Sequence, residues 1–416
     1  MFRPALWLSP FRRQLFSFTL LCWENIMKPI KSLSLLICLL LAACSSPTPT
    51  ASTPPPSIEI ATPYAAPSEA PPAVEQAATP YPEPPSSSPF TVQDALDRQV
   101  QFAAPPQRIV IAGKALFMLA NAAYTFPQAK DRIIAMGKTS QGTGNFIALI
   151  DPQYEQKATI AGDAGAEQIA AYQPDLVLLK SYLAESLGKP IETLGIAVVY
   201  LDLETPEQYQ RDLTTLGQLF GQPERAEAIK AYYQQKVTQI QQTVQDAEKP
   251  NVLILQYSDK DGKVAFNVPP QGWMQTILTE LAGGEPLWKQ IELGKGWTQV
   301  SFEQIAAWDA DQIFIISYFR NSAEVVNELK QDPQWQALRA VQQGNLYGFA
   351  GDLYSWDQPD VRWILGLSWL ASRIHPQLFP NYDVLQEVTQ FYQTLYGLDE
   401  TFVREKIVPA FTGDLP

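Results

Sequence analysis

A 16-residue stretch recurs in the chain in slightly altered form, as EQIAAYQPDLVLLKSY at 167–182 and EQIAAWDADQIFIISY at 303–318. Eight residues are shared in register (Glu, Gln, Ile, Ala, Ala, Asp, Ser and Tyr), and 303 − 167 places the copies 136 residues apart. Each copy has a helical turn, a polar break and then an apolar run, which is typical of a helix followed by a buried strand. The repeat therefore predicts two α/β units of similar plan.

Apolar runs alternate with helix-forming segments around both copies. The run Ile109–Ala112 ends at Gly113 and is followed by helix-forming residues, and Leu176–Leu179 is apolar throughout. A second such series begins with the run NVLILQYS at 251–258. Strands that alternate with helices indicate parallel sheets, so we expect two Rossmann-like lobes with central parallel sheets, at 90–222 and 250–416.

One long amphipathic helix is predicted at 223–249, between the two lobes. Its apolar residues recur every three or four positions, at Ala226, Ile229, Tyr233, Val237, Ile240 and Val244. Pro223 is compatible with the first turn of a helix, and Pro250 with its end. At 1.5 Å per residue the helix would be roughly 35–40 Å long, which is enough to join two lobes rigidly.

The N-terminus has the arrangement of regions that is typical of a secretory signal peptide. MKPIKSLSLLICLLLAAC has two lysines, an apolar run and small residues before Cys44, and Leu41–Cys44 resembles the bacterial lipobox. We expect residues 1–43 to be removed, with Met27 as an alternative start, and Cys44 to be lipidated. The alternative of a transmembrane helix is weakened because the run 33–43 is shorter than the ~20 residues that a span needs.

A proline-rich tether follows. Residues 45–89 hold 14 of the 35 prolines of the chain, mixed with Ser, Thr and Ala. Such a composition buries too little apolar surface to fold, so we interpret 44–89 as a linker between the lipid anchor and the lobes. All three cysteines (Cys22, Cys38 and Cys44) lie in the first 44 residues, so the lobes contain no disulfide.

Composition and motifs exclude several functions. The 416-residue chain has a net charge of −13, which argues against nucleic acid as a partner. A single histidine, His375, rules out sites that need several imidazoles. No GxSxG, HExxH or Walker-type motif occurs, so we expect no catalytic residue and no cofactor. A carboxylate-based hydrolase and a structural or adhesion lipoprotein remain alternatives.

Residues 90–400 resemble the helical-backbone solute-binding proteins of ABC importers. The resemblance is carried by DALDRQVQFAAPPQRIVIAG, by EQIAAYQPDLVLL and by GWTQVSFEQIAAWDADQIFII. Asp97 stands where such proteins often have glycine, which would alter a surface turn. The resemblance implies an extracytoplasmic monomer that binds a small molecule in a cleft between its lobes and delivers it to a permease dimer with its ATPase.

Ligand contacts are implied at the carboxyl ends of the strands, where open α/β sheets bind their ligands. The candidate residues there are Lys114, Asn145, Phe146, Lys180, Tyr182, Tyr257, Trp273, Trp297, Tyr318, Trp356 and Arg362. Aromatic side chains provide flat apolar contact and lysines favour an anion. Alternatively, Trp273 and Trp356 are packing residues and Lys180 is a solvated lysine.

The resemblance suggests a ferric siderophore or related iron complex as the ligand, with haem, cobalamin and an oxyanion such as molybdate as alternatives. A bare divalent metal is disfavoured because only His375 is present. The resemblance also implies that Glu167 and Glu303, one at the start of each repeat, meet arginines of the permease. The alternative is that each only stabilises its helix N-terminus.

Overall fold

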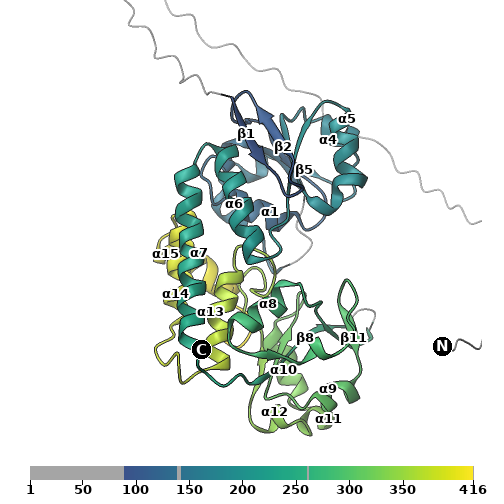
Figure 1. Cartoon of the computed structure of the whole chain (residues 1–416), viewed down its shortest axis with the longest axis vertical. Coiled ribbons are helices and arrows are strands. Elements are labelled where there is room, and N and C mark those ends of the chain that lie inside the picture. The colour runs from purple at the N-terminus through teal and green to yellow at the C-terminus, as the bar shows by residue number, and fades with distance from the viewer. Residues whose placement is uncertain (1–88, 138–141, 260–261, 416) are drawn as a thin grey trace, which may run out of the picture. The chain divides into compact units, whose positions relative to one another are not determined.

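The structure is a computed structural model that describes residues 89–137, 142–259 and 262–415. The chain divides into a unit 1–79 and a compact unit 80–416, and the description concerns the second unit (Figure 1). The predicted signal, Cys44 and nearly all of the linker 44–89 lie outside the described residues. Within the described part, no helix is long and apolar enough to cross a membrane.

The first sheet is wholly parallel, with strand order β5-β4-β3-β6-β7. Its strands are β3 (Ile109–Ile111), β4 (Ile133–Gly137), β5 (Ala158–Ile160), β6 (Leu176–Lys180) and β7 (Ala197–Leu201). Every residue of β3 and β6 is buried, which explains why these strands read as continuous apolar runs. The predicted α/β fold is therefore confirmed for this lobe.

The second sheet is mixed, with order β11-β9-β8-β12-β13 and β10 paired to β8. Its strands are β8 (Asn251–Ser258), β9 (Ala265–Val268), β10 (Glu285–Pro286), β11 (Thr298–Val300), β12 (Gln312–Ile316) and β13 (Leu346–Gly348). β8, β10, β12 and β13 pair in parallel, whereas β9 pairs antiparallel with β8 and β11 pairs antiparallel with β9. The parallel centre of this sheet agrees with the predicted parallel sheet of the second lobe. Its antiparallel edge was not predicted.

The repeated stretch forms the same structure in both lobes. It folds as α4 (Ala166–Ala170) followed by β6, and as α9 (Phe302–Trp308) followed by β12. β6 pairs with β3 and β7, and β12 pairs with β8 and β13. Each copy therefore supplies an inner strand, which explains the apolar runs 176–179 and 313–316.

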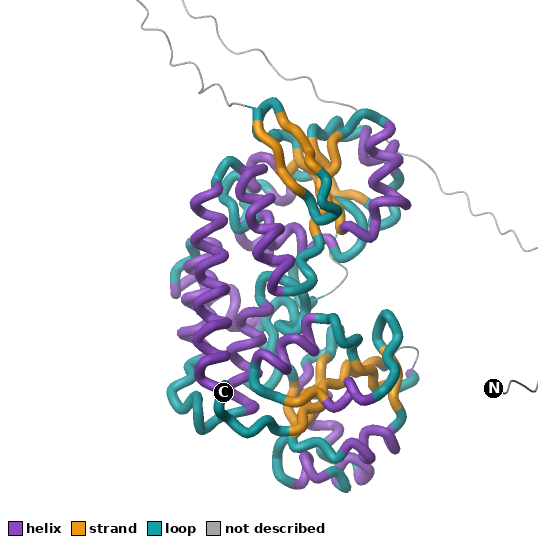
Figure 2. Tube along the Cα trace, in the orientation of Figure 1, coloured by secondary structure: helices purple, strands orange, loops and turns teal. Residues whose placement is uncertain are grey.

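A layer of long helices lies along both lobes (Figures 1 and 2). α7 (Pro223–Val244) begins at Pro223 and buries Ala226, Ile229, Tyr233, Ile240 and Val244, which are five of the six predicted stripe residues. Its 22 residues give a length of about 33 Å. α13 (Trp363–Ile374) and α14 (Val384–Tyr396) lie beside it, and the Tyr233 and Trp363 rings stack with centroids 5.1 Å apart.

Further α-helices and a hairpin complete the fold. The remaining helices are α1 (Leu116–Ala123), α2 (Ala129–Arg132), α3 (Phe146–Ile150), α5 (Lys189–Thr193), α6 (Pro206–Phe220), α8 (Met274–Leu281), α10 (Ser322–Leu329), α11 (Pro333–Gln336), α12 (Arg339–Gln342) and α15 (Glu400–Phe402). β1 (Phe90–Gln93) and β2 (Gln99–Phe102) form a hairpin whose turn contains Asp97 at φ 60°. Glycine adopts this left-handed conformation without cost and aspartate tolerates it.

The end of the chain packs against the first lobe. The Tyr396 hydroxyl donates to the Asn121 carbonyl oxygen at 2.9 Å, and the Tyr396 ring meets Phe146 with centroids 4.7 Å apart. Tyr392 packs on the same phenylalanine at 5.4 Å. α14 therefore covers α1 and α3, although more than 200 residues separate them in sequence.

Candidate functional site

A cavity of about 180 Å³ lies between elements of the two lobes. Its lining residues are Met118, Glu204, Trp273, Met274, Gln275, Trp297, Tyr318, Gln358 and Pro359. Met118 comes from α1 and Glu204 from the segment after β7, whereas Tyr318 follows β12. The cavity therefore sits at the carboxyl ends of strands from both sheets, where ligands of α/β proteins bind.

Three aromatic rings form one wall of the cavity. Trp273 and Trp297 are nearly perpendicular, at 89° with centroids 5.5 Å apart, and Trp297 lies 6.4 Å from Tyr318 at 61°. Trp273 directly precedes α8, Trp297 directly precedes β11 and Tyr318 follows β12. Edge-to-face rings hold one another in place, so the wall is preorganised for flat apolar contact.

A buried carboxylate, Asp357, organises the polar part of the wall from behind. Its Oδ2 accepts hydrogen bonds from the Tyr318 hydroxyl and from Gln275 Nε2, both at 2.8 Å, and its Oδ1 accepts from the Ser355 hydroxyl. Burial raises the pKa of Asp357 above its ordinary value, while these donors act in the opposite direction. Burial likewise raises the pKa of Tyr318 well above its ordinary value.

Two acceptors of the lining have no hydrogen-bond partner in the described part of the chain. They are Gln275 Oε1 and Gln358 Oε1, on side chains that are only 2% and 3% exposed. Because Asp357 takes the Nε2 group of Gln275, its Oε1 is the atom left over. Buried acceptors without a donor are costly; both oxygens have less than 1 Å² of accessible surface.

The acidic edge of the cavity is Glu204. Its Oε1 lies 2.5 Å from the Lys180 ammonium, which also donates to the Asp202 carbonyl oxygen. Lys180 is buried, whereas the Glu204 side chain is 44% exposed. Lys180 is therefore the buried partner of a partly exposed carboxylate, and it does not project into solvent as a free cation.

Of the candidate residues, Trp273, Trp297 and Tyr318 line the cavity together, and Lys180 lies one ion pair away from it through Glu204. Tyr182, at 60% exposure, donates from its hydroxyl to the Lys114 carbonyl oxygen at 3.4 Å. Lys114 is exposed as well. These two side chains lie outside the lining of the cavity.

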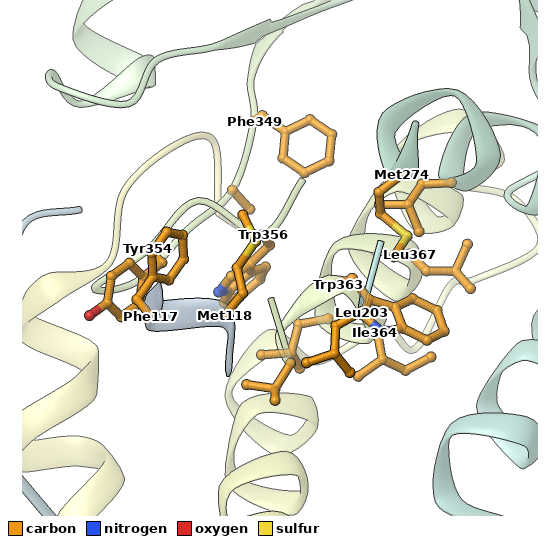
Figure 3. Close-up of a cluster of buried hydrophobic side chains, with 14 of the residues drawn as sticks. Phe117, Met118, Leu203, Met274, Phe349, Tyr354, Trp356, Trp363, Ile364 and Leu367 are labelled. Atoms are coloured by element: carbon orange, nitrogen blue, oxygen red, sulfur yellow. The ribbon is translucent and has the colours of Figure 1, made fainter. Parts of the chain in front are cut away.

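Phe146, Trp356 and Arg362 lie in the buried core. The guanidinium of Arg362 is fully buried, 2.9 Å from Asp352 and 2.7 Å from Asp360, and it packs over the Phe146 ring at 4.7 Å. Figure 3 shows Trp356 among apolar side chains, and it has no exposed surface. Because their ion pairs and apolar contacts lie within the core, these three residues have a structural role.

Asn145 and Tyr257 also have structural partners. Asn145 caps α3, because its Oδ1 accepts from the Ala148 backbone N–H at 3.3 Å. Tyr257 is nearly buried, and its hydroxyl accepts from Arg320 Nη1 at 3.5 Å.

Sequence reasoning missed several residues of the site, above all Glu204, Gln275, Asp357 and Gln358. Gln358 and Asp357 belong to a segment between β13 and α13 that contains no regular element. The polar cluster Asp357–Asp360 between apolar stretches is the signal that could have identified it.

Glu167 and Glu303 are exposed in the first turns of α4 and α9. The pKa of Glu303 is lowered by its own backbone N–H and by the Ser301 side chain, so this carboxylate is ionised at neutral pH. Within the described ranges, no three His, Cys, Asp or Glu side chains come together as a set that could hold a metal ion.

Comparison with known proteins gives a consistent result. A family model described as periplasmic binding protein matches residues 141–353, about half of the chain. A molybdate-binding protein of Haemophilus influenzae is 23% identical over 332 residues, covering 73% of this chain and 90% of the relative. The iron-uptake system-binding protein of Bacillus subtilis is 21% identical, covering 61% of this chain and 77% of the relative.

The fold has solved counterparts. The crystal structure of a periplasmic solute-binding protein from Veillonella parvula matches with a TM-score of 0.61 at 24% identity. The match covers 76% of this chain and 96% of that one.

Proposed function

This chain belongs to the periplasmic binding protein family, and from that premise we propose that it is the extracytoplasmic solute-binding lipoprotein of an ABC importer. The cargo we propose is a ferric siderophore or a related iron complex of an organic chelator. The protein captures this complex between its lobes and delivers it to the permease. It acts by binding, as do the relatives that it resembles, and it performs no reaction on its cargo.

The observation that supports this proposal best is the aromatic wall of Trp273, Trp297 and Tyr318 in a cavity between the lobes. Sites for organic ligands are concave and mostly apolar, with few polar groups. The cavity of about 180 Å³ is smaller than the ~300–1,000 Å³ that encloses a drug-sized molecule. It therefore receives one face or arm of the ligand.

An oxyanion is the second candidate, because a relative matched over 90% of its length is a molybdate-binding protein. Haem and cobalamin are further candidates, since a flat macrocycle could pack against the same rings. Each of these ligands can be supplied separately to the purified protein, so one binding experiment compares them.

We also propose that Glu167 and Glu303 dock the two lobes onto the two permease subunits. Both are exposed at equivalent positions of the repeated stretch. A carboxylate pairs with arginine through charge-assisted hydrogen bonds that fix orientation. A partner with two related subunits needs one such contact on each lobe.

The binding site is tested by replacing Trp297 with alanine. If the ligand packs against this ring, we expect affinity to fall by about 1–3 kcal/mol, because truncating a central aromatic contact removes its buried area. Titration with ferric siderophores, haemin, cyanocobalamin and molybdate, followed by tryptophan fluorescence and calorimetry, measures this loss.

Phe319→Ala is the control, since Phe319 is 77% exposed and is not part of the lining. Its affinity should match that of the wild type. If Trp297→Ala binds the ligand with unchanged affinity, the aromatic wall is not part of the binding site.

A further inference from the structure

Both ends of the row of aromatic rings in the cavity are tied to one buried carboxylate. At one end the Tyr318 hydroxyl donates to Asp357 Oδ2 at 2.8 Å. At the other end Gln275 Nε2 donates to the same oxygen at 2.8 Å, and Gln275 lies in the first turn of α8, two residues after Trp273. The Trp297 ring lies against both Trp273 and Tyr318. Asp357 therefore holds the whole row.

Asp357 differs from the other buried aspartates. Six aspartate side chains in the described residues are at most 2% exposed. Five of them form an ion pair with arginine or lysine, namely Asp94, Asp151, Asp212, Asp352 and Asp360. Asp357 forms no such ion pair within the described ranges, and hydroxyl and amide groups donate to it instead. Burying a carboxylate without a cation is costly, which is expected at a functional position and not in a core selected for stability alone.

The segment that begins at Asp357 also reaches the first lobe. The next two residues line the cavity, and Asp360 Oδ2 accepts from Asn121 Nδ2 at 2.6 Å. Asn121 belongs to α1, which also carries the lining residue Met118. Residues 357–360 therefore have a carboxylate at each end, and each carboxylate is bonded to a different side of the cavity.

Resting on the proposed function, we infer that Asp357 is a positioning residue of the binding site, which fixes the rings that the ligand packs against. It is fully buried and is not part of the lining, so it acts through Tyr318 and Gln275. A wall that is fixed before the ligand arrives loses little conformational entropy on binding. Loss of this carboxylate therefore lowers affinity without removing a ligand contact, whatever the charge of the ligand.

The first test needs no ligand. Tryptophan is replaced by fluorotryptophan in the purified protein, and the fluorine NMR signals of Trp273 and Trp297 are assigned from the Trp273→Phe and Trp297→Phe variants. In Asp357→Leu, which removes both acceptor oxygens, we expect these two signals to shift or broaden, because the rings have lost their anchor. Asp357→Asn should keep them near their wild-type positions, since its amide oxygen can accept both wall donors while its N–H group donates to the Ser355 hydroxyl.

The second test measures affinity by calorimetry, with ferric desferrioxamine B, haemin, cyanocobalamin and molybdate as probes. For a probe that binds the wild type, we expect Asp357→Leu to bind about tenfold more weakly, as the loss of a hydrogen bond to a charged group implies. Asp357→Asn should bind with close to wild-type affinity.

Asp151→Leu is the matched control. Asp151 is 2% exposed and accepts from the Tyr124 hydroxyl at 2.7 Å, but it is not part of the lining. Its replacement should leave the ring signals and the affinity unchanged. Thermal melting shows whether each variant folds. If a leucine variant does not fold, Tyr318→Phe and Tyr124→Phe repeat the comparison with a single hydroxyl removed.

The outcomes separate the inference from the proposed function. Wild-type ring signals and affinity in folded Asp357→Leu overturn the inference. Equal effects of Asp357→Asn and Asp357→Leu also overturn it, because they assign the effect to charge and not to positioning. Equal effects of Asp151→Leu do the same, because they indicate general loosening of the fold. If the wild type binds none of the four probes, the proposed cargo is contradicted, and the ring signals alone decide the positioning role.

Discussion

Arg362 shows how one buried charge can determine the stability of a lobe junction. Its guanidinium lies between Asp352 and Asp360, and all three side chains have no exposed surface. Asn121 of the first lobe donates to the same Asp360 at 2.6 Å. The network thus joins α1 to the segment that precedes α13.

Replacing Arg362 with methionine should lower the free energy of unfolding by about 3–5 kcal/mol, because two buried carboxylates lose their cation. Urea denaturation measures this loss. The triple variant Arg362→Met, Asp352→Asn, Asp360→Asn should recover much of it, since it removes the charges together. Near-wild-type stability of the single variant would contradict this structural role.

His375 makes stability depend on pH in a defined direction. Its Nε2 lies 3.2 Å from the Gly283 carbonyl oxygen, and burial lowers the pKa of the imidazole, with the hydrogen bond acting in the opposite direction. The folded state therefore prefers the neutral ring. Its contribution is fully present above the unfolded pKa of about 6.5 and is lost as the pH falls through the lower folded-state pKa.

We therefore expect the free energy of unfolding to decrease with acidification below about pH 6.5. The change should be smaller in His375→Gln. Because the chain has one histidine, a single imidazole NMR signal reports its pKa directly. A midpoint at or above that of a free imidazole would show that the sign is wrong.

Residues of the candidate site could be predicted only where a local sequence pattern marked their position. Trp297 and Tyr318 border strands of the second sheet and were identified from that position. Asp357 was missed because its segment has no periodicity and its position depends on packing. Lys180 was expected to face an anionic ligand, but its partner Glu204 lies 24 residues further along the chain, and no local pattern relates the two.

At the scale of elements, α4–β6 and α9–β12 have the same order of a helix followed by an inner strand. The repeated stretch in the sequence predicted this equivalence. Periodicity also identified α7 and its buried face. The antiparallel edge of the second sheet did not follow, because three of the four residues of β9 are only half-buried. Such a short strand carries a weak pattern.

The equivalence of α4 and α9 leads to a prediction about docking. Glu167→Arg with Glu303→Arg should abolish transport and stimulated ATP hydrolysis in vesicles containing the importer, because both arginine-binding charges are reversed. Ligand affinity and melting temperature should stay close to those of the wild type, since both side chains are exposed.

The matched control is Glu224→Arg with Glu324→Arg, which reverses two exposed first-turn glutamates of α7 and α10. It makes the same charge change and should transport normally. Equal transport activity of the two double variants would contradict the docking role, and Glu167 and Glu303 would then only stabilise the N-termini of their helices.

At the scale of the whole molecule, the lipid anchor and the lobes should be separable. Labelled palmitate should enter the wild-type protein and be absent from Cys44→Ala, which removes the predicted lipidation site. The variant should leave the membrane fraction and keep the melting temperature of the lobes, because a proline-rich tether has no core to share with them. Labelling that persists in Cys44→Ala would exclude this residue as the anchor.

The packing of α14 on the first lobe has a consequence for how the protein is made. A nascent chain that ends before Val384 lacks the rings that cover Phe146 and the hydroxyl that meets Asn121. The first lobe, although translated early, therefore lacks these contacts until α14 has been synthesised. Contacts this distant in sequence slow folding and leave apolar surface open to aggregation meanwhile.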